Sequence, residues 1–451
     1  MITEGIFKAN DIRGEVGVQW DAAGAAAVGA AFVELAGLEG QEFVMGRDMR
    51  TTGEEMSRAF AAGAASRGAR IKDIGLASTD GLWHASGAFA LPGVQFSASH
   101  NPAKDNGIKF CRSAARPVET DFLSRLRDRA MELDGTVDTT LPEGVVEQVD
   151  ALSGYAEHLR TLVPLEGIRP LKVVIDAGNG MAGHTVGAVL GNLPLEIIGL
   201  YLDLDGTFPH HQPNPLEPQN LVDAQQAVRE HSADLALVFD GDADRCFLID
   251  ERGEVVSPSA ITALIARAEL EREPGATIVI NTITSRTVAD VVGEHGGTCV
   301  VSKVGHTFVK ALMAEHDAIF GGEHSAHYYF RDFWGADTGM LAALYVLNIL
   351  GRRQAPLSEV MSEYERYAAS GEINSTVQDA QAVMGRVEHA FANRGESDWI
   401  DGLTVRAEEW WFNLRPSNTE PYLRLNVEAA DQPMMVGIRD EVLALVRESQ
   451  S

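Results

Sequence analysis

The sequence predicts an α/β fold, because apolar strand-like runs alternate with helical patterns along most of the chain. Three stretches show the pattern best, each with an apolar run that leads into a glycine-rich or polar turn: residues 171–183, 233–245 and 276–292. Such stretches are typical of βα units, which build parallel or mixed sheets. At 451 residues the chain is too long for one compact core, so we expect several domains.

Turn-rich segments divide the chain into four predicted domains. They lie at 133–146, 249–258 and 365–375. After the last of them, a helical stretch at 379–391 is followed by the strand-like segments WWFNLRP and YLRLNVEA, which indicates a small α+β domain. The expected domains are residues 1–140, 150–252, 255–365 and 370–451.

The charge of the chain is unusual, with 37 basic against 65 acidic residues and a net charge of −28. Such a field repels nucleic acids and anionic membranes, so neither is an expected partner. If the substrate is an anion, basic side chains must gather locally against the field of the whole protein. Basic residues inside motifs are therefore candidates for contact with such a substrate.

The cysteine pattern and the chain start indicate an intracellular protein. Cys111, Cys246 and Cys299 are far apart and form no CxxC pair, which supports neither a disulfide framework nor a thiolate zinc site. The start MITEGIFKAND has no apolar leader segment. Apolar runs are shorter than the roughly 20 residues of a membrane span. We expect a soluble, cytoplasmic protein.

The stretch FSASHNPAKDNGIKF, residues 96–110, contains a Ser-His pair and a lysine ten residues after the serine. Ser99, His100 and Lys109 are candidates for nucleophilic or acid/base chemistry. A Ser-His pair in a run of turn-forming residues is more often a polar loop between two elements. The stretch alone leaves both interpretations open.

The stretch VFDGDADRCFLID places Asp240, Asp242 and Asp244 directly after an apolar run. Three carboxylates this close repel one another unless a cation lies between them, and hard oxygen ligands favour Mg²⁺ or Ca²⁺. An acidic surface turn is the structural alternative. An EF-hand calcium loop is excluded, because Arg245 stands where that loop needs glycine and the flanks look like strands. A phosphate on Ser99 would fill part of the metal shell, and Arg245 could hold the same phosphate.

Two later stretches carry polar residues suited to a sugar phosphate. In NLRPSNTEPYLRL, one turn gathers an arginine and three short hydrogen-bonding side chains, with a second arginine close by: Arg415, Ser417, Asn418, Thr419 and Arg424. This turn suits an anion, although a purely structural turn explains it equally well. In FGGEHSAHYYF, three polar residues alternate and would share one face of an extended segment, where they could bind sugar hydroxyls: Glu323, Ser325 and His327.

A zinc site made by Glu323, His324 and His327 is the alternative for this stretch, although nothing else in the sequence supports it. Just upstream, the segment SKVGHTFVK adds Lys303 and His306 immediately before a predicted helix. These two residues are further candidates for contact with an anionic substrate.

Five motifs in order resemble the α-D-phosphohexomutase superfamily over nearly the whole chain: FKANDIRG (7–14), SASHNP (97–102), DGDADR (240–245), GEHSAH (322–327) and RPSNTEP (415–421). The first and fourth look most like the bacterial phosphomannomutase branch, which includes bifunctional phosphomannomutase/phosphoglucomutases. Asn10, His324 and Ala326 depart from the commoner patterns, and NTITSRT lacks a lysine that some relatives carry there. These departures affect sugar contacts and leave substrate breadth open.

The resemblance implies three related α/β/α domains and a smaller, mobile C-terminal α+β domain around a central cleft. It implies that Ser99 carries a phosphoryl group and that Mg²⁺ binds the three aspartates and the phosphorylated Ser99. The expected reaction interconverts mannose 1-phosphate and mannose 6-phosphate through a hexose 1,6-bisphosphate, which also serves as activator. The sequence leaves open a monomer or a homodimer, and supply of GDP-mannose is implied only by the resemblance.

The resemblance also assigns roles. Lys109 is the expected general acid/base, with His100 as the alternative, and Arg245 orients the transferred group. A lysine that acts as a base at neutral pH needs a depressed pKa. The loop that begins at Arg415 would hold the phosphate that is not transferred, while Glu323 and Ser325 would bind sugar hydroxyls. His327 is a further candidate for substrate contact.

Eight basic side chains fall in or beside these motifs, and we expect them to line the cleft: Lys8, Arg13, Lys109, Arg245, Lys303, His306, Arg415 and Arg424. Lys8 is equally well explained as a surface residue. Main activity as a phosphoglucomutase or a phosphoglucosamine mutase is an alternative within the family. A metal-dependent phosphatase and a catalytically dead sugar-phosphate-binding regulator are alternatives of a different class.

Overall fold

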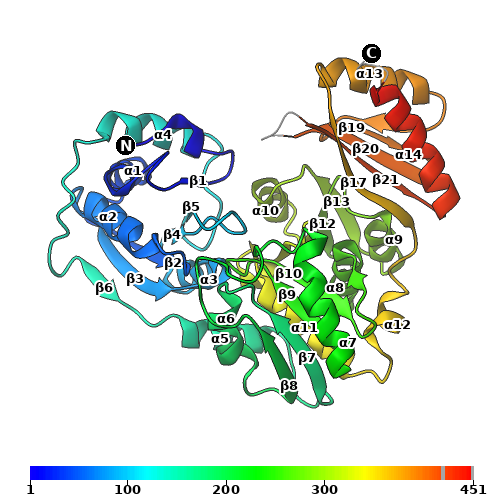
Figure 1. Cartoon of the computed structure of the whole chain (residues 1–451), viewed down its shortest axis with the longest axis horizontal. Coiled ribbons are helices and arrows are strands. Elements are labelled where there is room, and N and C mark those ends of the chain that lie inside the picture. Colours follow the sequence, from blue (N-terminus) through cyan, green and yellow to red (C-terminus); the bar gives the residue numbers. More distant parts are fainter. Residues whose placement is uncertain (418–421, 448–451) are drawn as a thin grey trace. The chain divides into compact units, whose positions relative to one another are not determined.

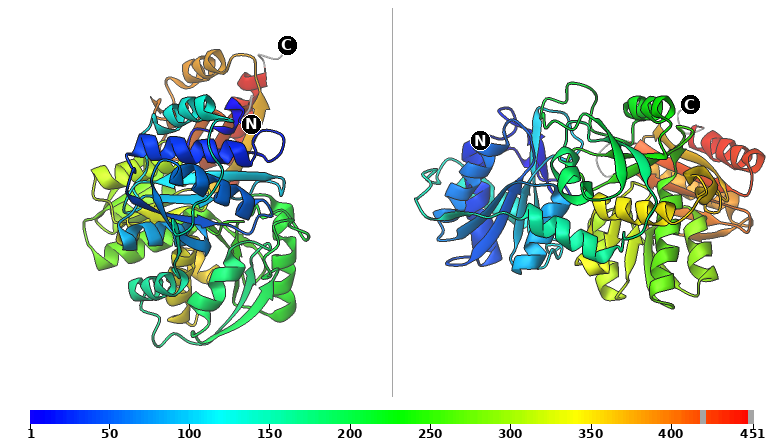
Figure 2. Two further views of the ribbon diagram at one scale, coloured as in Figure 1. Left: turned by 90° about the vertical axis from the view of Figure 1, so that its left-hand side faces the viewer. Right: turned by 90° about the horizontal axis from the view of Figure 1, so that it is seen from below.

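The computed structural model describes residues 1–417 and 422–447, which form two compact units. The first unit comprises Met1–Val256 and Ser325–Ser358, and the second comprises Ser257–His324 and Glu359–Ser451. Figure 1 labels the elements of both units, and Figure 2 shows two further views. Within the described residues, no helix combines the length and the apolar character that a membrane span requires.

The N-terminal part of the first unit is a mixed six-stranded sheet with helices on both faces (Figures 1 and 2). The strand order is β1 (Ile12–Glu15), β5 (Asp105–Cys111), β4 (Gly93–Phe96), β2 (Glu42–Arg47), β3 (Arg70–Leu76) and β6 (Val146–Gln148). The helices are α1 (Ala22–Ala36), α2 (Gly53–Ala65), α3 (Thr79–Phe89) and α4 (Phe122–Leu133), with the short 3₁₀ helix η1 (Glu4–Ile6) before β1. Strand β5 runs antiparallel to both of its neighbours.

Phenylalanine rings fill the core of this sheet. Phe32 on α1 contacts Phe43, Phe60 and Phe110 at centroid distances of 5.4, 5.8 and 5.4 Å, and all four lie in one apolar cluster with α4. Alanine and glycine let α1 and α2 approach closely, because a Cβ on Gly29 would lie 2.1 Å from the Phe60 carbonyl oxygen. Close packing of this core holds β4 and β5 in place, and with them the polar loop at residues 97–104 that joins the two strands.

The second sheet of this unit has the order β11 (Val255–Val256), β10 (Cys246–Asp250), β9 (Leu235–Phe239), β7 (Leu171–Asp176) and β8 (Leu195–Leu200). Its helices are α5 (Leu152–Leu162), α6 (Ala182–Leu190) and α7 (Val222–His231), with the 3₁₀ helix η2 (Pro218–Leu221) before α7. Strands β7, β8 and β9 are parallel, whereas β10 is antiparallel to β9. The predicted strand, turn and helix of 171–183 are confirmed by β7 and α6, and DGDADR joins two strands as the sequence indicated.

A segment from later in the chain completes the first unit: β15 (Tyr328–Phe330), η3 (Arg331–Phe333), β16 (Ala336–Asp337) and α11 (Gly339–Gly351). Asp80, the second residue of α3, explains part of this association. Its fully buried carboxylate accepts hydroxyl hydrogen bonds from Ser78 (2.5 Å), Tyr155 on α5 (2.6 Å) and Thr338 (2.7 Å). Burial raises the pKa of Asp80 to about 6, so the three hydroxyl donors are what keep its charge in place.

Two histidine side chains lie where α3 packs against α5, and little solvent reaches them. The His84 ring on α3 lies 5.5 Å from that of His158 on α5, and Trp334 lies 5.8 and 4.9 Å from the two rings. Among the described residues, His84 Nδ1 and His158 Nε2 are buried without a hydrogen-bond partner. Burial lowers the pKa of His84 to about 4 and also lowers the pKa of His158.

His84→Leu is expected to flatten the dependence of stability on pH between about pH 6.5 and pH 4. The folded-state pKa of His84 lies below the unfolded value, so the unfolded chain takes up the proton first and stability is lost as pH falls. The wild type should lose on the order of 2 kcal/mol more than the variant over this range. Urea unfolding at several pH values measures the difference. The exposed His389→Leu should follow the wild-type profile, and parallel profiles for wild type and His84→Leu would contradict the prediction.

The second unit begins with three parallel strands in the order β13 (Thr298–Ser302), β12 (Thr277–Asn281) and β14 (Phe320–Gly322). Helices α8 (Pro258–Arg272), α9 (Arg286–Glu294) and α10 (His306–Glu315) accompany them. The βα unit predicted at 276–292 is confirmed by β12 and α9. Helix α12 (Leu357–Met361) lies where the chain passes from the first unit to the second.

An antiparallel sheet forms the rest of the second unit, in the order β17 (Ala368–Thr376), β21 (Tyr422–Ala429), β20 (Trp410–Pro416), β19 (Leu403–Arg406) and β18 (Glu396–Asp398). Helices α13 (Ala380–Phe391) and α14 (Gln432–Arg447) pack on one face of it around a single apolar core (Figure 1). This arrangement confirms the predicted small α+β domain.

Candidate active site

Ser99 lies in the loop between β4 and β5, in a conformation that serine rarely adopts. Its φ is +51°, in the left-handed region, and the side chain is 3% exposed. The loop is fixed by its own neighbours, since the Ser99 N–H donates to Ser97 Oγ at 2.9 Å. A strained backbone that the surroundings hold in place is typical of a functional residue.

Three polar groups surround the Ser99 hydroxyl. Oγ donates to Asp240 Oδ2 at 3.0 Å, and it lies 3.2 Å from His100 Nδ1 and 3.4 Å from Arg245 Nη2. The Arg245 guanidinium also contacts His100 Nδ1 at 2.5 Å, which makes this nitrogen an acceptor. Burial, and then the charge of Arg245, lowers the pKa of His100 well below its usual value. The predicted nucleophile therefore lies beside a neutral imidazole, a carboxylate and a guanidinium.

The DGDADR loop brings its three aspartates together between β9 and β10. Asp240, Asp242 and Asp244 each offer one oxygen, and these oxygens lie within 4.8 Å of one another. The loop reaches the Ser99 loop because residue 241 is glycine, as a Cβ there would lie 2.5 Å from the Ser99 carbonyl oxygen. The strand flanks confirm that this is no EF-hand.

The carboxylates are only partly satisfied. Asp242 Oδ1 and Asp244 Oδ1 are buried and have no hydrogen-bond partner among the described residues. Buried carboxylate oxygens without donors are costly, and a hard divalent cation is the ligand that would remove the cost. The residues therefore fit a metal ion of the magnesium or calcium type. A neighbouring group of Asp244, His327 and Asp337 could also hold a metal ion, whereas the predicted zinc set is not among the metal-binding groups of the described residues.

Lys109 on β5 neutralises part of this charge. Its Nζ lies 2.6 Å from both Asp242 Oδ2 and Asp244 Oδ2. Burial works to lower the pKa of Lys109, but the two carboxylates outweigh it and hold the pKa far above its usual value. The same ammonium holds the pKa of Asp242 well below its usual range, against the effect of burial. The depressed pKa that a lysine base requires is thus not found, and in this arrangement Lys109 is a lasting ammonium that donates hydrogen bonds to the two carboxylates.

Arg245 and Asp240 form the second charged pair. Asp240 Oδ2 accepts from Arg245 Nε at 2.9 Å and from Nη2 at 2.7 Å. Burial raises the pKa of Asp240 to about 7, although Arg245 opposes the shift. Arg13, from the first motif, donates to Asp11 at 2.8 Å and to Asn101 at 3.1 Å in the Ser99 loop. Arg13, Lys109 and Arg245 thus lie near one another, while Lys8 is an exposed residue that donates to the Gly5 carbonyl.

Two residues that contact the site, Arg50 and Thr79, were not predicted from the sequence. Arg50 is buried and donates to four carbonyl oxygens of the Ser99 loop region, those of Ser99, Asn101, Pro102 and Asp105, at 2.7–2.8 Å. Thr79 at the start of α3 donates to Asp242 Oδ2 at 2.5 Å, and its N–H donates to the Asp242 carbonyl at 3.0 Å. A buried charge after an apolar strand, in VMGRDMR, was the available signal for Arg50. Nothing in the sequence around Thr79 indicates its role.

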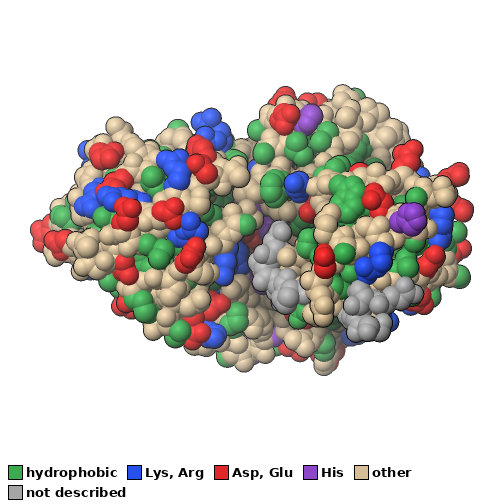
Figure 3. Space-filling model, turned by 90° about the horizontal axis from the view of Figure 1, so that it is seen from above, with side chains coloured by type: hydrophobic (Ala, Val, Ile, Leu, Met, Phe, Trp, Pro, Cys, Tyr) green, Lys and Arg blue, Asp and Glu red, His purple; other side chains and the backbone are tan. Residues whose placement is uncertain are grey.

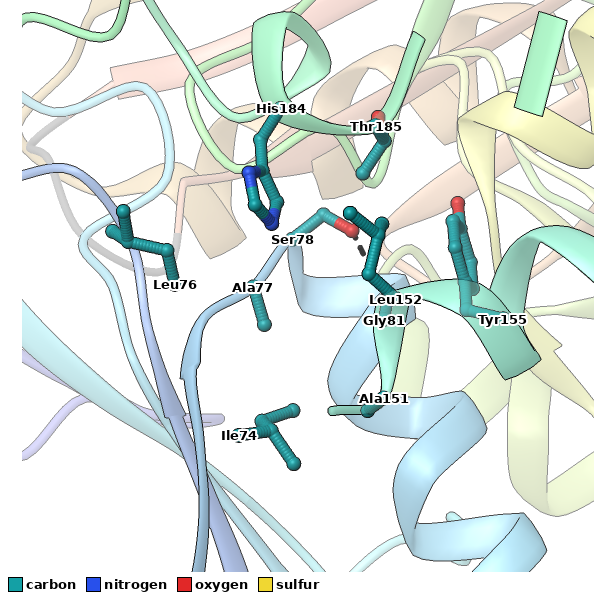
Figure 4. Close-up of a pocket in the computed structure, with 10 residues that line it drawn as sticks. All are labelled: Ile74, Leu76, Ala77, Ser78, Gly81, Ala151, Leu152, Tyr155, His184 and Thr185. Atoms are coloured by element: carbon teal, nitrogen blue, oxygen red, sulfur yellow. Dashed lines mark hydrogen bonds between the residues drawn. The ribbon is translucent and has the colours of Figure 1, made fainter. Parts of the chain in front are cut away.

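The start of α3 is itself firmly positioned. Figure 4 shows Ser78 beside α5 and α6, with its hydroxyl accepting the Gly81 N–H at 3.2 Å. A cavity of about 20 Å³ lies there, large enough for one water molecule. Of its polar side chains, Ser78 and Tyr155 serve the helix cap and the Asp80 contacts, and Thr185 contacts carbonyls of its own helix, so this cavity offers little to a ligand.

Thr79→Val is expected to weaken metal binding at the aspartate loop by about tenfold or more, because outer groups that orient ligating carboxylates contribute to this extent. The variant removes one donor to Asp242 and keeps the side-chain volume. Calorimetric titration with Mg²⁺ measures the change. Thr185→Val is the matched control, since that buried hydroxyl contacts only carbonyls of its own helix. Equal Mg²⁺ affinity in the two variants would refute this role.

The GEHSAH segment differs from the sequence-based expectation. Residues 323–326 form a turn, and Ala326 has a φ of +65°, so the expectation of one extended face with alternating side chains is wrong. In the first unit, Ser325 Oγ contacts His327 Nδ1 at 2.9 Å, and His327 Nε2 lies 3.7 Å from Asp244 Oδ1. In the second unit, Glu323 Oε1 accepts from Asn281 Nδ2 at 3.0 Å and from the Gly305 N–H at 3.1 Å. Short-range turn geometry overrode the alternation.

Further candidate residues of the second unit lie near Glu323. Glu323 joins the turn before α10, where Lys303 Nζ lies 5.9 Å from the Phe308 ring centroid and His306 is the first residue of the helix. His324 Nδ1 lies 3.1 Å from Ser259 Oγ, and burial lowers the pKa of this histidine.

The phosphate-loop candidates lie at one end of the antiparallel sheet. Arg415 and Arg424 are direct cross-strand partners on β20 and β21, and Glu372 bridges them at 2.9 and 3.3 Å. Arg415 is 5% exposed, and its Nε has no hydrogen-bond partner among the described residues. Ser417 donates its N–H to the Tyr422 carbonyl at 2.8 Å, whereas the predicted residues Asn418 and Thr419 lie outside the described residues. Two guanidinium groups suit an anionic ligand, and the Arg415 Nε–H is a donor that no described residue uses.

One face of the molecule carries acidic and basic side chains intermixed. On the face shown in Figure 3, lysine and arginine side chains are scattered among aspartates and glutamates.

Known protein families match the chain in four successive parts. They are phosphoglucomutase/phosphomannomutase α/β/α domain I over residues 4–135, domain II over 153–253, domain III over 257–367 and the C-terminal domain over 372–445. The predicted architecture of three α/β/α domains and a smaller C-terminal domain is confirmed by these matches.

Individual relatives match over the whole length. The chain is 39% identical over 450 residues to a phosphomannomutase of Salmonella montevideo, covering 98% of each protein. It is 39% identical over 453 residues to a phosphomannomutase of Escherichia coli K12, covering 98% of this chain and 99% of the relative. A crystal structure of a phosphoglucomutase/phosphomannomutase family protein from Burkholderia thailandensis superimposes with a TM-score of 0.91 at 31% identity, covering 100% of this chain and 98% of that one.

Proposed function

Since the chain belongs to the phosphoglucomutase/phosphomannomutase family, we propose that it is a phosphomannomutase that interconverts mannose 1-phosphate and mannose 6-phosphate. Membership of this family makes the protein an isomerase, an intramolecular phosphotransferase. The observation that carries the proposal is the Ser99 hydroxyl, held within 3.4 Å of Asp240, His100 and Arg245. The 39% identity to named phosphomannomutases, over 98% of this chain, favours mannose phosphates as substrates.

The proposed reaction runs through a phosphoserine. The phosphoryl group on Ser99 Oγ passes to the free hydroxyl of the hexose monophosphate, so the Oγ–P bond breaks and a new sugar O–P bond forms. The resulting hexose 1,6-bisphosphate then returns its other phosphoryl group to Ser99 Oγ. Two transfers through an enzyme nucleophile avoid a direct transfer between distant oxygens of one ring.

Arg245 and Lys109 are placed to serve these transfers. Arg245 donates toward Ser99 Oγ and can hold the oxygens of a phosphoryl group there. Lys109 is an ammonium that can offset negative charge. Asp240, Asp242 and Asp244 would hold Mg²⁺, with an oxygen of the phosphorylated Ser99 as a further ligand, and the bound ion would supply positive charge that offsets charge on the phosphoryl oxygens. His100 Nδ1 lies 3.2 Å from Ser99 Oγ and is the other candidate base, although it already accepts a hydrogen bond from Arg245.

The second unit would bind the remainder of the substrate. Arg415 and Arg424, with the Ser417 loop, would hold the phosphate that is not transferred. Glu323, whose oxygen already accepts two N–H groups, would accept sugar hydroxyls, and Lys303 and His306 lie beside the same turn. Ser325 and His327 of the first unit are the further candidates for sugar contact.

A mutase assay tests the proposal. The purified protein with Mg²⁺ and a trace of hexose 1,6-bisphosphate is supplied with mannose, glucose or glucosamine 1-phosphate. Conversion of mannose 1-phosphate to the 6-phosphate is expected, and the rate with glucose 1-phosphate decides whether the enzyme is bifunctional. Turnover of glucosamine 1-phosphate alone would overturn the mannose assignment. Release of inorganic phosphate without isomerisation would indicate a phosphatase, and binding without any turnover a regulator.

A further inference from the structure

The second unit contains a cavity of about 290 Å³ that none of the residues assigned above to catalysis, metal or substrate lines. One wall comes from the end of β12 and the start of α9, with Asn281, Thr282 and Arg286. The facing wall comes from the β19–β20 turn, with Arg406 and Trp411. The volume lies just below the range for drug-sized ligands and suits a small metabolite.

The hydroxyl of Thr282 indicates that this cavity binds a ligand. Its side chain is 3% exposed, it lines the cavity, and its Oγ1 has no hydrogen-bond partner among the described residues. Buried hydroxyls are nearly always hydrogen-bonded, so this one calls for a partner inside the cavity.

Two guanidinium groups give the cavity a positive lining, against one carboxylate, that of Asp290. Arg286 Nη1 donates to the Glu408 carbonyl and its Nε lies 3.6 Å from Asp290, while Arg406 Nη1 pairs with Asp398. Each guanidinium has five N–H donors, so both retain donors for a further acceptor.

The N-terminus of α9 adds nothing to this site, because the Arg286 N–H already donates to Glu428 Oε1 at 2.9 Å. Apolar contact comes from other lining residues: Ile280, Ala289, Val301, Ala407 and Trp411. The cavity therefore combines an anion-binding side with an apolar side.

We propose that this cavity binds a small phosphate monoester, whose phosphate takes the Arg286, Arg406 and Thr282 donors and whose body packs on the apolar wall. A tetrahedral dianion with several acceptor oxygens matches two guanidinium groups and a hydroxyl better than a planar carboxylate does.

Each wall of the cavity includes a residue that is bonded to, or shares a strand with, a candidate substrate-binding residue. A ligand in the cavity would therefore affect substrate binding. Asn281, on one wall, donates to Glu323 Oε1 at 3.0 Å, and its Oδ1 accepts from Thr284 Oγ1 at 2.8 Å, another lining residue. Trp411, on the other wall, belongs to the same strand as Arg415. An occupant that braces the two walls would change the KM for the sugar phosphate, an effect that rests on the proposed function.

Calorimetric titration of the full chain with glycerol 1-phosphate and with inorganic phosphate tests the binding. Arg415→Met serves as the background, because it removes the competing phosphate contact of the candidate active site. Binding should persist in Arg415→Met and weaken at least tenfold when Thr282→Val or Arg406→Gln is added. Thr282→Val removes only a hydroxyl without a partner, so its Tm should not fall.

Binding that disappears in Arg415→Met and is unchanged by Thr282→Val and Arg406→Gln would overturn the proposal, as would no binding of either probe. Binding that follows the cavity variants in a protein without mutase activity would support the cavity and refute the proposed function alone. A changed KM for mannose 1-phosphate with saturating glycerol 1-phosphate, absent in Thr282→Val, would support the regulatory effect. An unchanged KM would overturn that effect.

Discussion

Lys109→Met is expected to lose about 3–5 kcal/mol of folding stability in metal-free buffer, the usual cost when one partner of a buried ion pair is removed. The ammonium lies 2.6 Å from Asp242 and from Asp244, and both carboxylates are almost fully buried. Without it, two buried carboxylates remain close together, each with an oxygen that has no hydrogen-bond partner among the described residues. The variant is thus expected to be far less stable than the loss of one apolar stem would explain.

Mg²⁺ should restore part of this loss, because a divalent cation between the aspartates offsets the same charge. Urea unfolding with and without Mg²⁺ measures both effects, and the stabilisation by Mg²⁺ should be larger in Lys109→Met than in the wild type. Lys104→Met is the matched control: its Nζ also lies 2.6 Å from a carboxylate, that of Glu15, but the pair is exposed and should contribute little. Equal stabilisation by Mg²⁺ in wild type and Lys109→Met would show that the lysine and the metal do not share these carboxylates.

Local patterns in the sequence predicted the parts of the site that are continuous along the chain. The three aspartates follow a buried strand and lie within five residues, so their convergence needs no tertiary information. The βα units at 171–183 and 276–292 have the same basis, because the apolar strand and the helix that follows it are adjacent in the sequence. The position of Ser99 beside them, 141 residues from Asp240, could be expected only from a resemblance to known proteins.

What the sequence could not show depends on contacts between distant segments. Thr79 reaches Asp242 across 163 residues, and Thr338 reaches Asp80 across 258. Both threonines lie at the start of a helix, where threonine is common, so neither stands out in the sequence. The alternation in GEHSAH failed for the opposite reason, because a left-handed residue at Ala326 turns a locally regular pattern. The protonation of Lys109 likewise follows from two carboxylates of another sheet.

Ser99→Ala is expected to lower mutase turnover by about 10⁴-fold or more, as loss of an enzyme nucleophile usually does. The purified wild type should carry one phosphoryl group on a peptide that contains Ser99, and the variant none, as measured by mass spectrometry. The surface variant Ser124→Ala should keep both the phosphoryl group and full turnover. Turnover that persists in Ser99→Ala would exclude this serine as the phosphoryl carrier.

Ser99→Gly separates this chemical loss from any effect on folding. Alanine keeps the positive φ of +51° that is unfavourable for a side chain, whereas glycine adopts it freely. Both variants lose the same hydroxyl contacts, so Ser99→Gly should be more stable than Ser99→Ala by about 1 kcal/mol in urea unfolding, yet equally inactive. Restored turnover in the more stable variant would mean that Ser99→Ala acts through folding. Equal inactivity with unequal stability would mean that the protein keeps a strained backbone at this position for the sake of the hydroxyl it presents.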